Sequence, residues 1–210
     1  MTWENETFPA ILNVWFGGCE SANAICDVLF GDKAPSGKLS ATMPKNVGQI
    51  PLFYNHLNTG RPLAEGRWFE KFHSTYLDVD NDPLFPFGYG LSYTTFSYGK
   101  PSLSSTTLSE GGKLTLSVDV TNTGSYDADE VVQLYVRDLV GSVSRPVKEL
   151  KGFKRISLKK GEKQTVSFDI TPEDLKFYNQ ELECKWEPGD FDIMVGSNSR
   201  DVQTLRFTLK

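Results

Sequence analysis

The sequence of 210 residues has few cysteines and histidines. Its cysteines are Cys19, Cys26 and Cys184, none of which forms a C-x-x-C pair, and its only histidines are His56 and His73. A structural zinc site takes four such ligands, normally in closely spaced pairs. The sequence therefore predicts no metal site and no cofactor, and this sparse cysteine set leaves the redox compartment open.

Long apolar runs and an excess of positive charge are also missing. No stretch reaches the ~18 consecutive apolar residues that cross a bilayer. Lysine and arginine number 22 against 27 aspartate and glutamate residues, a net charge of −5. Because a nucleic-acid partner requires a basic face to neutralise phosphates, we expect neither a membrane partner nor a nucleic-acid partner.

The amino-terminal part, residues 1–45, reads as a piece of an α/β unit. Residues 9–16 contain one polar position in eight, which is typical of a strand buried on both faces of a parallel sheet. Residues 21–30 place apolar side chains at the helical spacing, and Gly31 is suited to end the helix. The apolar positions of this expected helix are Ala22, Ile25, Cys26 and Leu29.

The expected strand at residues 9–16 requires neighbouring strands, and the sequence offers only one more short candidate, at residues 38–43. Leaving five large apolar side chains in water would forfeit roughly 8–15 kcal/mol, about the stability of a whole domain. We therefore expect this segment to be the tail of a larger sheet whose other strands lie upstream. In the isolated chain, either the segment folds onto the rest of the molecule or two copies form a homodimer that shields it.

Residues 46–99 are rich in glycine and proline, yet they hold 12 of the 26 aromatic residues. Flexible linkers are poor in aromatic residues, so we expect an ordered but irregular connector. Residues 100–210 alternate between apolar and polar positions in short runs separated by turns. This pattern indicates a mainly β fold, an antiparallel β-sandwich of the immunoglobulin-like or fibronectin type III-like kind.

Three long stretches carry specific motifs. The first runs from Trp15-Phe-Gly-Gly-Cys through Pro35-Ser-Gly-Lys-Leu39 to Met43-Pro44. The second joins Ile50-Pro-Leu-Phe-Tyr-Asn-His-Leu-Asn-Thr-Gly-Arg-Pro62 to Pro83-Leu-Phe-Pro-Phe-Gly-Tyr-Gly-Leu-Ser-Tyr93. The third comprises Val120-Thr-Asn-Thr-Gly124, Glu130-Val-Val-Gln-Leu-Tyr135, Arg145-Pro146 and Lys148-Glu-Leu-Lys-Gly-Phe153. Together and in this order they resemble the C-terminal region of family 3 glycoside hydrolases of the bacterial periplasmic β-glucosidase type.

The resemblance implies the end of an α/β sandwich domain followed by a fibronectin type III-like domain. It also implies that the catalytic nucleophile lies on an N-terminal barrel and the acid/base residue upstream in the α/β domain. Retaining hydrolysis requires both carboxyl groups, and neither motif can be matched here, so no catalytic residue is assigned. We expect this chain alone to be inactive and its partners to be the rest of the parent enzyme and, in the parent, a β-glycoside. The family resemblance implies a periplasmic or secreted location.

His56, Asn58 and Arg61 are the candidate substrate-rim residues, because they bring hydrogen-bonding groups to a loop flanked by aromatic residues. The alternative is that they only bond loop carbonyls. Glu20 is a second candidate, at the end of the expected α/β strand, although an acid there also suits the start of a helix.

Two further features have a structural alternative to a functional role. The residues Trp68, Phe69, Tyr178 and Trp186 could stack on sugars, or could be packed in the core. The run at residues 85–93 lacks the spacing of a phosphate-binding glycine loop, so we expect Phe85, Phe87 and Tyr89 to pack under the sandwich. The loop at residues 138–146 is long for a hairpin, which is typical of interface or functional loops.

Three functions remain open from the sequence. The first is an accessory C-terminal region of a β-glucosidase-like glycoside hydrolase. The second is an independent carbohydrate-binding module, and the third is a β-sandwich that binds another protein through a contiguous apolar patch.

Overall fold

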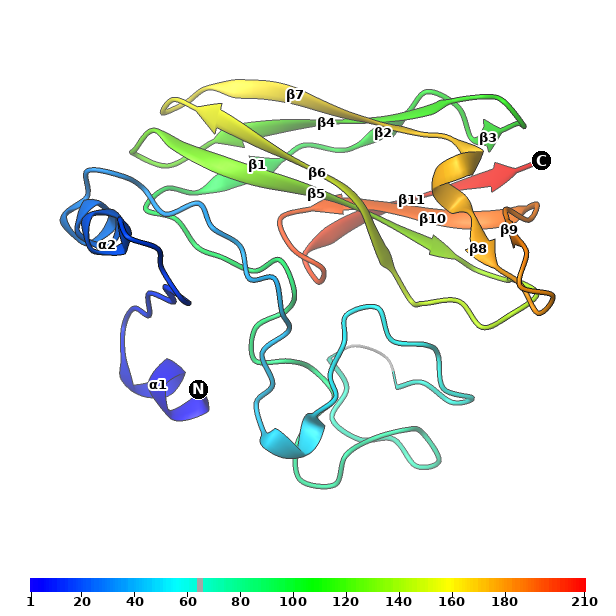
Figure 1. Cartoon of the computed structure of the whole chain (residues 1–210), viewed down its shortest axis with the longest axis horizontal. Coiled ribbons are helices and arrows are strands. Elements are labelled where there is room, and N and C mark those ends of the chain that lie inside the picture. The colour runs from blue at the N-terminus through cyan, green and yellow to red at the C-terminus, as the bar shows by residue number, and fades with distance from the viewer. Residues whose placement is uncertain (64–65) are drawn as a thin grey trace.

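The computed structural model describes residues 1–63 and 66–210, so residues 64–65 of the connector lie outside the description. A β-sandwich forms the larger part, and the amino-terminal segment and the connector lie along one side of it (Figure 1). The helices are α1 (Thr2–Thr7), α2 (Ser21–Phe30) and the short 3-10 turns η1 (Val47–Gln49) and η2 (Pro172–Leu175). Within the described residues, no helix is long and apolar enough to cross a lipid bilayer.

The sandwich consists of two sheets. In the first, β4 (Leu114–Asn122) pairs with β7 (Lys163–Ile170), β1 (Phe96–Tyr98) and β2 (Ser102–Leu103), all antiparallel. The second has the order β3-β11-β10-β5-β6, and its β3–β11 pair is parallel. Its strands are β3 (Thr107–Leu108), β5 (Ala128–Asp138), β6 (Glu149–Leu158), β10 (Gly189–Gly196) and β11 (Val202–Leu209). A small hairpin of β8 (Phe177–Tyr178) and β9 (Cys184–Lys185) completes the domain.

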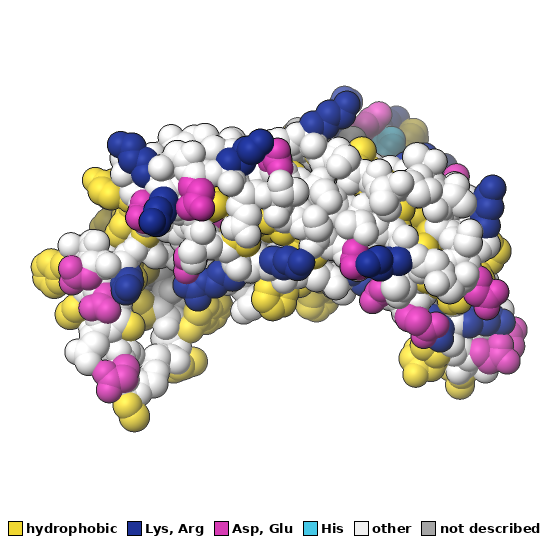
Figure 2. Space-filling model, turned by 90° about the horizontal axis from the view of Figure 1, so that it is seen from above, with side chains coloured by type: hydrophobic (Ala, Val, Ile, Leu, Met, Phe, Trp, Pro, Cys, Tyr) yellow, Lys and Arg dark blue, Asp and Glu magenta, His cyan; other side chains and the backbone are white. Residues whose placement is uncertain are grey.

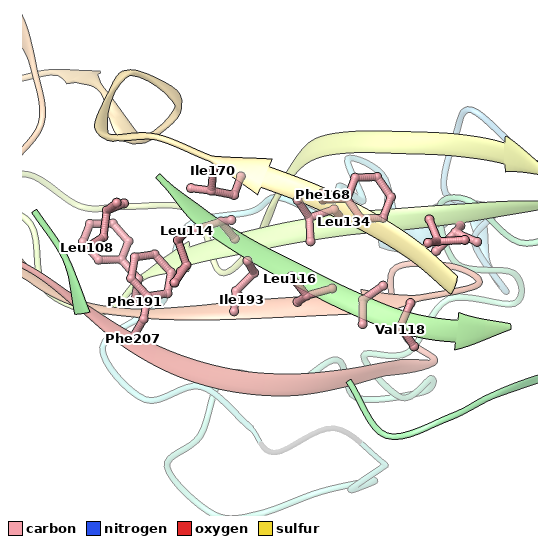
Figure 3. Close-up of a cluster of buried hydrophobic side chains, with 14 of the residues drawn as sticks. Leu108, Leu114, Leu116, Val118, Leu134, Phe168, Ile170, Phe191, Ile193 and Phe207 are labelled. Atoms are coloured by element: carbon pink, nitrogen blue, oxygen red, sulfur yellow. The ribbon is translucent and has the colours of Figure 1, made fainter. Parts of the chain in front are cut away.

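The core lies between the two sheets, and the strand periodicity explains it. Along β4 every second residue is buried, as expected for a strand with one face inward. Leu114, Leu116 and Val118 of β4 meet Leu134 of β5, Phe168 of β7 and the stacked rings of Phe191 and Phe207 (Figure 3). The sequence prediction of a mainly β, fibronectin-like sandwich is therefore confirmed.

Helix α2 ends where the sequence predicts, and the short turn η2 also has a clear local cause. Helix α2 spans residues 21–30, and Gly31 ends it with a left-handed φ of 85°, a conformation that glycine adopts without a Cβ penalty. Thr171 begins η2 with a reciprocal capping box in which Asp174 takes part, and Pro172 is the first residue of the turn.

The predicted strand at residues 9–16 is wrong for this chain. Residues 8–16 form no strand, and Trp15 has a φ of 46°, outside the extended region. The physical reason is that a strand requires a partner, and the described part of the chain provides none for it. Its apolar side chains remain exposed.

The predicted strand at residues 38–43 is reduced to a single β-bridge between Met43 and Phe85. Backbone hydrogen bonds join Leu39 to Gly88 and Tyr89, and Met43 to Leu84 and Phe85. Since Pro83 and Pro86 in the partner segment have no N–H to donate, a continuous ladder cannot form. The bridge nevertheless links the amino-terminal part to the connector.

One group of exposed apolar side chains lies at the amino-terminal end of the molecule. In Figure 2 the projection at the left, where Figure 1 places α1 and α2, carries many hydrophobic atoms. The residues concerned include Phe8, Ile11, Leu12, Val14, Trp15, Phe16, Leu29 and Phe30, of which Phe16 and Phe30 are 105% and 82% exposed.

Candidate functional site

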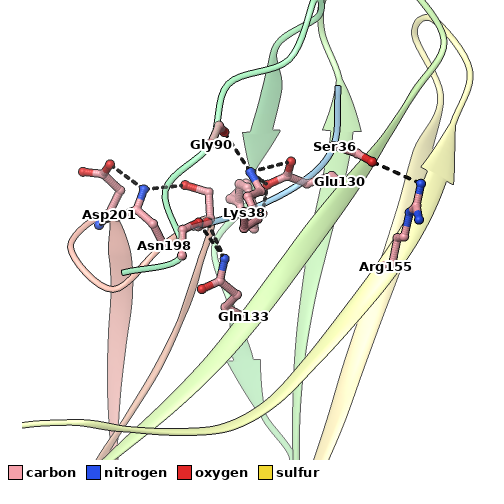
Figure 4. A network of polar contacts seen from close by, with 11 residues as sticks. Ser36, Lys38, Gly90, Glu130, Gln133, Arg155, Asn198 and Asp201 are labelled. Atoms are coloured by element: carbon pink, nitrogen blue, oxygen red, sulfur yellow. Dashed lines mark hydrogen bonds and ion pairs between the residues drawn. The ribbon is translucent and has the colours of Figure 1, made fainter. Parts of the chain in front are cut away.

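The junction between the connector and the sandwich is built around a buried ion pair. Lys38 Nζ lies 3.2 Å from a carboxylate oxygen of Glu130 and donates to the Gly90 carbonyl at 3.0 Å (Figure 4). The hydroxyl of Tyr98 donates to the same carboxylate at 2.8 Å. Burial, followed by the charge of Glu130, raises the pKa of Tyr98, so this hydroxyl stays protonated. An acid, a base and a carbonyl thus satisfy each other where the sandwich meets residues 36–39 and 90.

Gln133 makes the second contact between these two parts. Its Nε2 donates to the carbonyls of Gly88 (3.0 Å) and Ser197 (2.7 Å), and its Oε1 accepts from the Tyr135 hydroxyl at 2.5 Å. Gly88 has a φ of +79°, and a Cβ there would lie 2.0 Å from Gln133 Oε1. The close approach of the connector to β5 therefore requires glycine at this position.

A third cluster holds the connector together internally. The side chain of Gln49 is fully buried and all of its hydrogen-bonding capacity is used. Nε2 donates to the carbonyls of Asp80 and Asp82, while Oε1 accepts from the N–H groups of Lys45 and Asn46. This satisfied amide explains how a segment with so little regular structure stays ordered.

The candidate substrate-rim residues lie on one loop, residues 53–61, which we call the rim loop. The side chains of His56, Asn58 and Arg61 are exposed. Nδ1 of His56 lies 3.0 Å from the Leu57 carbonyl, and within the described residues no hydrogen bond from the side chain of Asn58 or Arg61 is seen. The structure places the three side chains on one exposed loop.

The rim loop is attached to the sandwich by its backbone and by one aromatic ring. The His56 carbonyl accepts from the Val147 N–H at 2.9 Å, and Leu57 forms a β-bridge with Pro146. Tyr54 stacks on Phe87, with ring centroids 4.3 Å apart, and its hydroxyl accepts from the Leu150 N–H at 3.3 Å. The sandwich therefore reaches the rim loop through residues 146–150 and through Tyr135 of β5, whose ring lies edge-on to that of Tyr54 with centroids 5.8 Å apart.

The predicted loop at residues 138–146 surrounds one arginine. The Arg145 guanidinium lies 4.1 Å from the ring centroid of Phe177 and donates to Glu149 at 3.0 Å. It also faces Asp138 at 3.7 Å, a distance too long for a hydrogen bond. Burial raises the pKa of Asp138 above its ordinary value. Ser142 donates twice to Glu187, which closes the far side of the loop.

The other sequence candidates are placed as follows. Glu20 precedes α2 and accepts from Asn23 at 2.6 Å, which fits the structural alternative. Trp186 packs against the core cluster, whereas Trp68, Phe69 and Tyr178 are exposed. Phe85 stacks on Tyr89, and Phe87 stacks on Tyr54 beside the outer face of β5.

A wide groove of about 1480 Å³ separates the amino-terminal segment from the edge of the sandwich. It is lined on one side by residues 8–13 and α2, and on the other by residues 127–129 and 155–159. Within the described residues, no group of three histidine, cysteine or carboxylate side chains is arranged to hold a metal ion. The acid with a raised pKa, Asp138, is buried in its own loop. The groove and the junction are therefore suited to packing against other protein segments.

Comparison with protein families divides the chain into two parts. The model of the glycosyl hydrolase family 3 C-terminal domain matches residues 1–93. The model of the fibronectin type III-like domain matches residues 130–199.

Relatives match almost the whole chain. It is 52% identical over 206 residues to a periplasmic beta-glucosidase of Salmonella typhimurium, covering 98% of this chain and 27% of that protein. It is 47% identical to a beta-xylosidase of Formosa agariphila, covering 98% and 28%. The solved structure of a beta-glucosidase from Listeria innocua in complex with glucose matches with a TM-score of 0.87 and 43% identity, covering 93% of this chain and 27% of that one.

The chain belongs to the C-terminal region of the family 3 glycoside hydrolases. It spans about a quarter of the length of the relatives it matches. The resemblance inferred from the three sequence motifs is confirmed.

For this family 3 region, sequence reasoning missed the Lys38–Glu130–Tyr98 cluster. One signal was available. Glu130 occupies the same phase of β5 as Val132 and Leu134, both buried. An acid at a core-facing position is almost always paired, which would have indicated a buried partner, although not that the partner is Lys38.

Proposed function

We propose that this chain is the accessory C-terminal region of a glycoside hydrolase that acts on β-glycosides. The observation that carries the proposal is the order and extent of the matches, in which two family 3 regions account for both parts of the chain. Relatives named as beta-glucosidase and beta-xylosidase support the substrate class. The relative from Salmonella typhimurium is named as periplasmic, and we propose a periplasmic or secreted location.

In this proposal the catalytic carboxyl groups lie elsewhere in the enzyme, and the chain braces them. The connector is fixed to the sandwich by the buried Lys38–Glu130 pair and by Gln133. The groove and the exposed apolar segment at residues 8–16 are the surfaces that the rest of the enzyme would cover. We also propose the division into an α/β remnant (1–45), a connector (46–99) and a sandwich (100–210).

Activity measurements test the bracing role. The 210-residue chain is expected to show no turnover of an aryl β-glucoside or an aryl β-xyloside, while the full-length enzyme does. Replacing Lys38 with Met in the enzyme is expected to lower its midpoint of thermal inactivation, because Glu130 then stays buried without its partner. Turnover by the isolated chain that is abolished by a mutation within it would contradict the proposal.

We further propose that His56, Asn58 and Arg61 contact sugar units at the outer edge of the substrate pocket. Their exposed side chains on one loop support this. In the full-length enzyme, His56→Ala is expected to raise KM for longer oligosaccharides more than it changes kcat. Unchanged kinetics on both short and long substrates would contradict the rim role.

A carbohydrate-binding module is the second candidate, and the exposed rings of Trp68, Phe69 and Tyr178 favour it. The burial of Trp186 against the core removes one ring from the expected stacking platform. Isothermal titration of the chain with cellobiose and xylan oligosaccharides separates the two, because only a binding module would release heat without the rest of the enzyme.

A further inference from the structure

The rim loop has little packing of its own. Phe53 and Leu57 are 61% and 52% exposed. The ring of Tyr54 contacts those of Phe87 and Tyr135, and the Arg61 carbonyl accepts from the Ser74 N–H. The rim loop also has hydrogen bonds from Val147 and Leu150 and a bridge to Pro146. These last three partners all lie in residues 146–150. The hydrogen bonds that join the middle of the rim loop to the sandwich therefore depend on how firmly that short stretch is held.

One side chain, that of Arg145, connects the two ends of the loop that precedes β6. Asp138 is the last residue of β5, Glu149 is the first residue of β6, and the guanidinium contacts both. The side chain is only 14% exposed, and its planar group lies over the Phe177 ring. Lysine could not reproduce this arrangement, because an ammonium group has neither the planar face nor the fork of donors.

Stability alone does not account for this arrangement. Arg145 Nε and Asp138 Oδ2 are buried and have no hydrogen-bond partner within the described residues. A buried ion pair with unsatisfied atoms contributes little net stability. Pro146 and Val147 follow directly after Arg145 and are the residues to which the rim loop is attached. Holding the Arg145 side chain therefore fixes the direction of the backbone at this attachment.

We propose that Arg145 is a positioning residue for the rim loop, through which the sandwich sets the geometry of the sugar-contacting side chains. The proposal rests on the rim role proposed above for His56, Asn58 and Arg61. Arg145 acts through the 146–150 backbone and touches no substrate.

Hydrogen exchange on the 210-residue chain tests the positioning step without reference to activity. In Arg145→Met, an unbranched apolar side chain replaces the guanidinium group, so the charge and the hydrogen bond to Glu149 are removed. The amides of Val147 and Leu150 and those of the rim loop are expected to exchange about tenfold faster, while amides in the β4–β7 ladder are unchanged. Glu149→Gln is a milder second variant with a smaller effect in the same direction. Arg206→Met, which removes an exposed arginine paired with Asp192, is the matched control. It should leave the exchange rates of the rim-loop amides and of Val147 and Leu150 unchanged.

Kinetics of the full-length enzyme test the consequence. Arg145→Met is expected to raise KM for oligosaccharides roughly tenfold, less than the roughly hundredfold cost that a misplacement of ~1 Å can have. The kcat on an aryl monoglycoside is expected to stay within about twofold of that of the unmodified enzyme. A loss of stability alone would lower the active fraction for all substrates equally. Unchanged exchange at Val147 overturns the positioning role. Faster exchange with unchanged KM in both the Arg145 and the His56 variants overturns the rim role on which it rests.

Discussion

Hydroxyl groups on neighbouring strands bind three carboxylates of the sandwich. Thr165 donates to Asp119 at 2.6 Å, Thr115 to Asp169 at 2.7 Å, and Ser157 to Asp129 at 2.5 Å. These hydrogen bonds, supported by nearby Lys163, Lys113 and Arg155 respectively, lower the pKa of each acid below its ordinary value of 3.8. A lowered pKa in the folded state means that the ionised form stabilises the fold. This stabilisation is complete above pH ~4 and is lost as pH falls through the folded-state pKa.

Thr165→Val is expected to reduce the acid sensitivity of the sandwich. Without the hydroxyl, the pKa of Asp119 moves back toward 3.8, so the free energy of unfolding falls less between pH 5 and pH 3, values chosen to bracket the ordinary pKa of aspartate. Urea titrations at several pH values measure this. Thr106→Val is the control, because it removes an exposed hydroxyl that bonds no carboxylate in the described residues. In this variant the slope of unfolding free energy against pH should equal that of the unmodified protein. Equal slopes in all three proteins would contradict the role of the hydroxyl.

The pKa of Asp138 is shifted in the opposite direction from those of the three acids above. Burial raises its pKa, so its charged form disfavours folding and its contribution improves as pH falls. The direction of the pKa shift thus separates the three acids that accept from a neighbouring hydroxyl, Asp119, Asp129 and Asp169, from Asp138, where burial is the largest effect and Oδ2 has no hydrogen-bond partner in the described residues.

At the scale of elements, the contact between the connector and β5 depends on a glycine. Gly88 requires both a left-handed backbone and the absence of a side chain, since Gln133 occupies the space of a Cβ. Gly111 shares the left-handed φ, at +70°, but has open space around it. The two positions therefore separate the cost of backbone conformation from the cost of a steric conflict.

Gly111→Ala is expected to lower the free energy of unfolding by about 1 kcal/mol, the cost of a left-handed alanine. Gly88→Ala is expected to lower it by about 3 kcal/mol or more, because Gln133 must also give up buried hydrogen bonds. Chemical denaturation of both variants measures the difference. Equal losses would show that the connector does not press on Gln133 in solution.

Elements with local causes could be predicted from the sequence. The alternation along β4, the stripe of α2, the cap at Gly31 and the capping box at Thr171 all depend on neighbouring residues. The strand predicted at residues 9–16 requires partner strands, and the described residues provide none, so no local pattern could decide it. The same holds for the junction, since Lys38 and Glu130 are 92 positions apart and the sequence gives no indication that they meet.

At the scale of the whole molecule, the sandwich is complete and the amino-terminal end is not covered. Core residues such as Leu116 and Ile193 are fully buried, whereas Leu12 and Phe16 are 41% and 105% exposed. The first of the two alternatives for residues 9–16, folding onto the sandwich, is therefore wrong. Their apolar surface is of the kind that marks a contact with other protein, and for the isolated chain we propose that a second copy provides it.

The isolated chain is expected to run as a dimer or larger species in multi-angle light scattering. Replacing Leu12 and Phe16 together by Asp is expected to shift it toward the monomer, because charged side chains resist burial in an apolar contact. Leu77→Asp, a change at another exposed leucine in the connector, is the control and should leave the mass unaltered. A monomer for the unmodified chain across concentrations would contradict this proposal.

The parallel pairing of β3 with β11 has a consequence for the order in which the domain folds. Strand β3 pairs only with β11, so Thr107 has no partner until Thr208 is in place. One edge of β5 likewise stays unpaired until β10 is in place. Pairings of such long sequence separation close slowly, and an unpaired strand edge is meanwhile open to pairing with another chain. The domain therefore completes its second sheet only once β11, its last strand in sequence, is available for pairing.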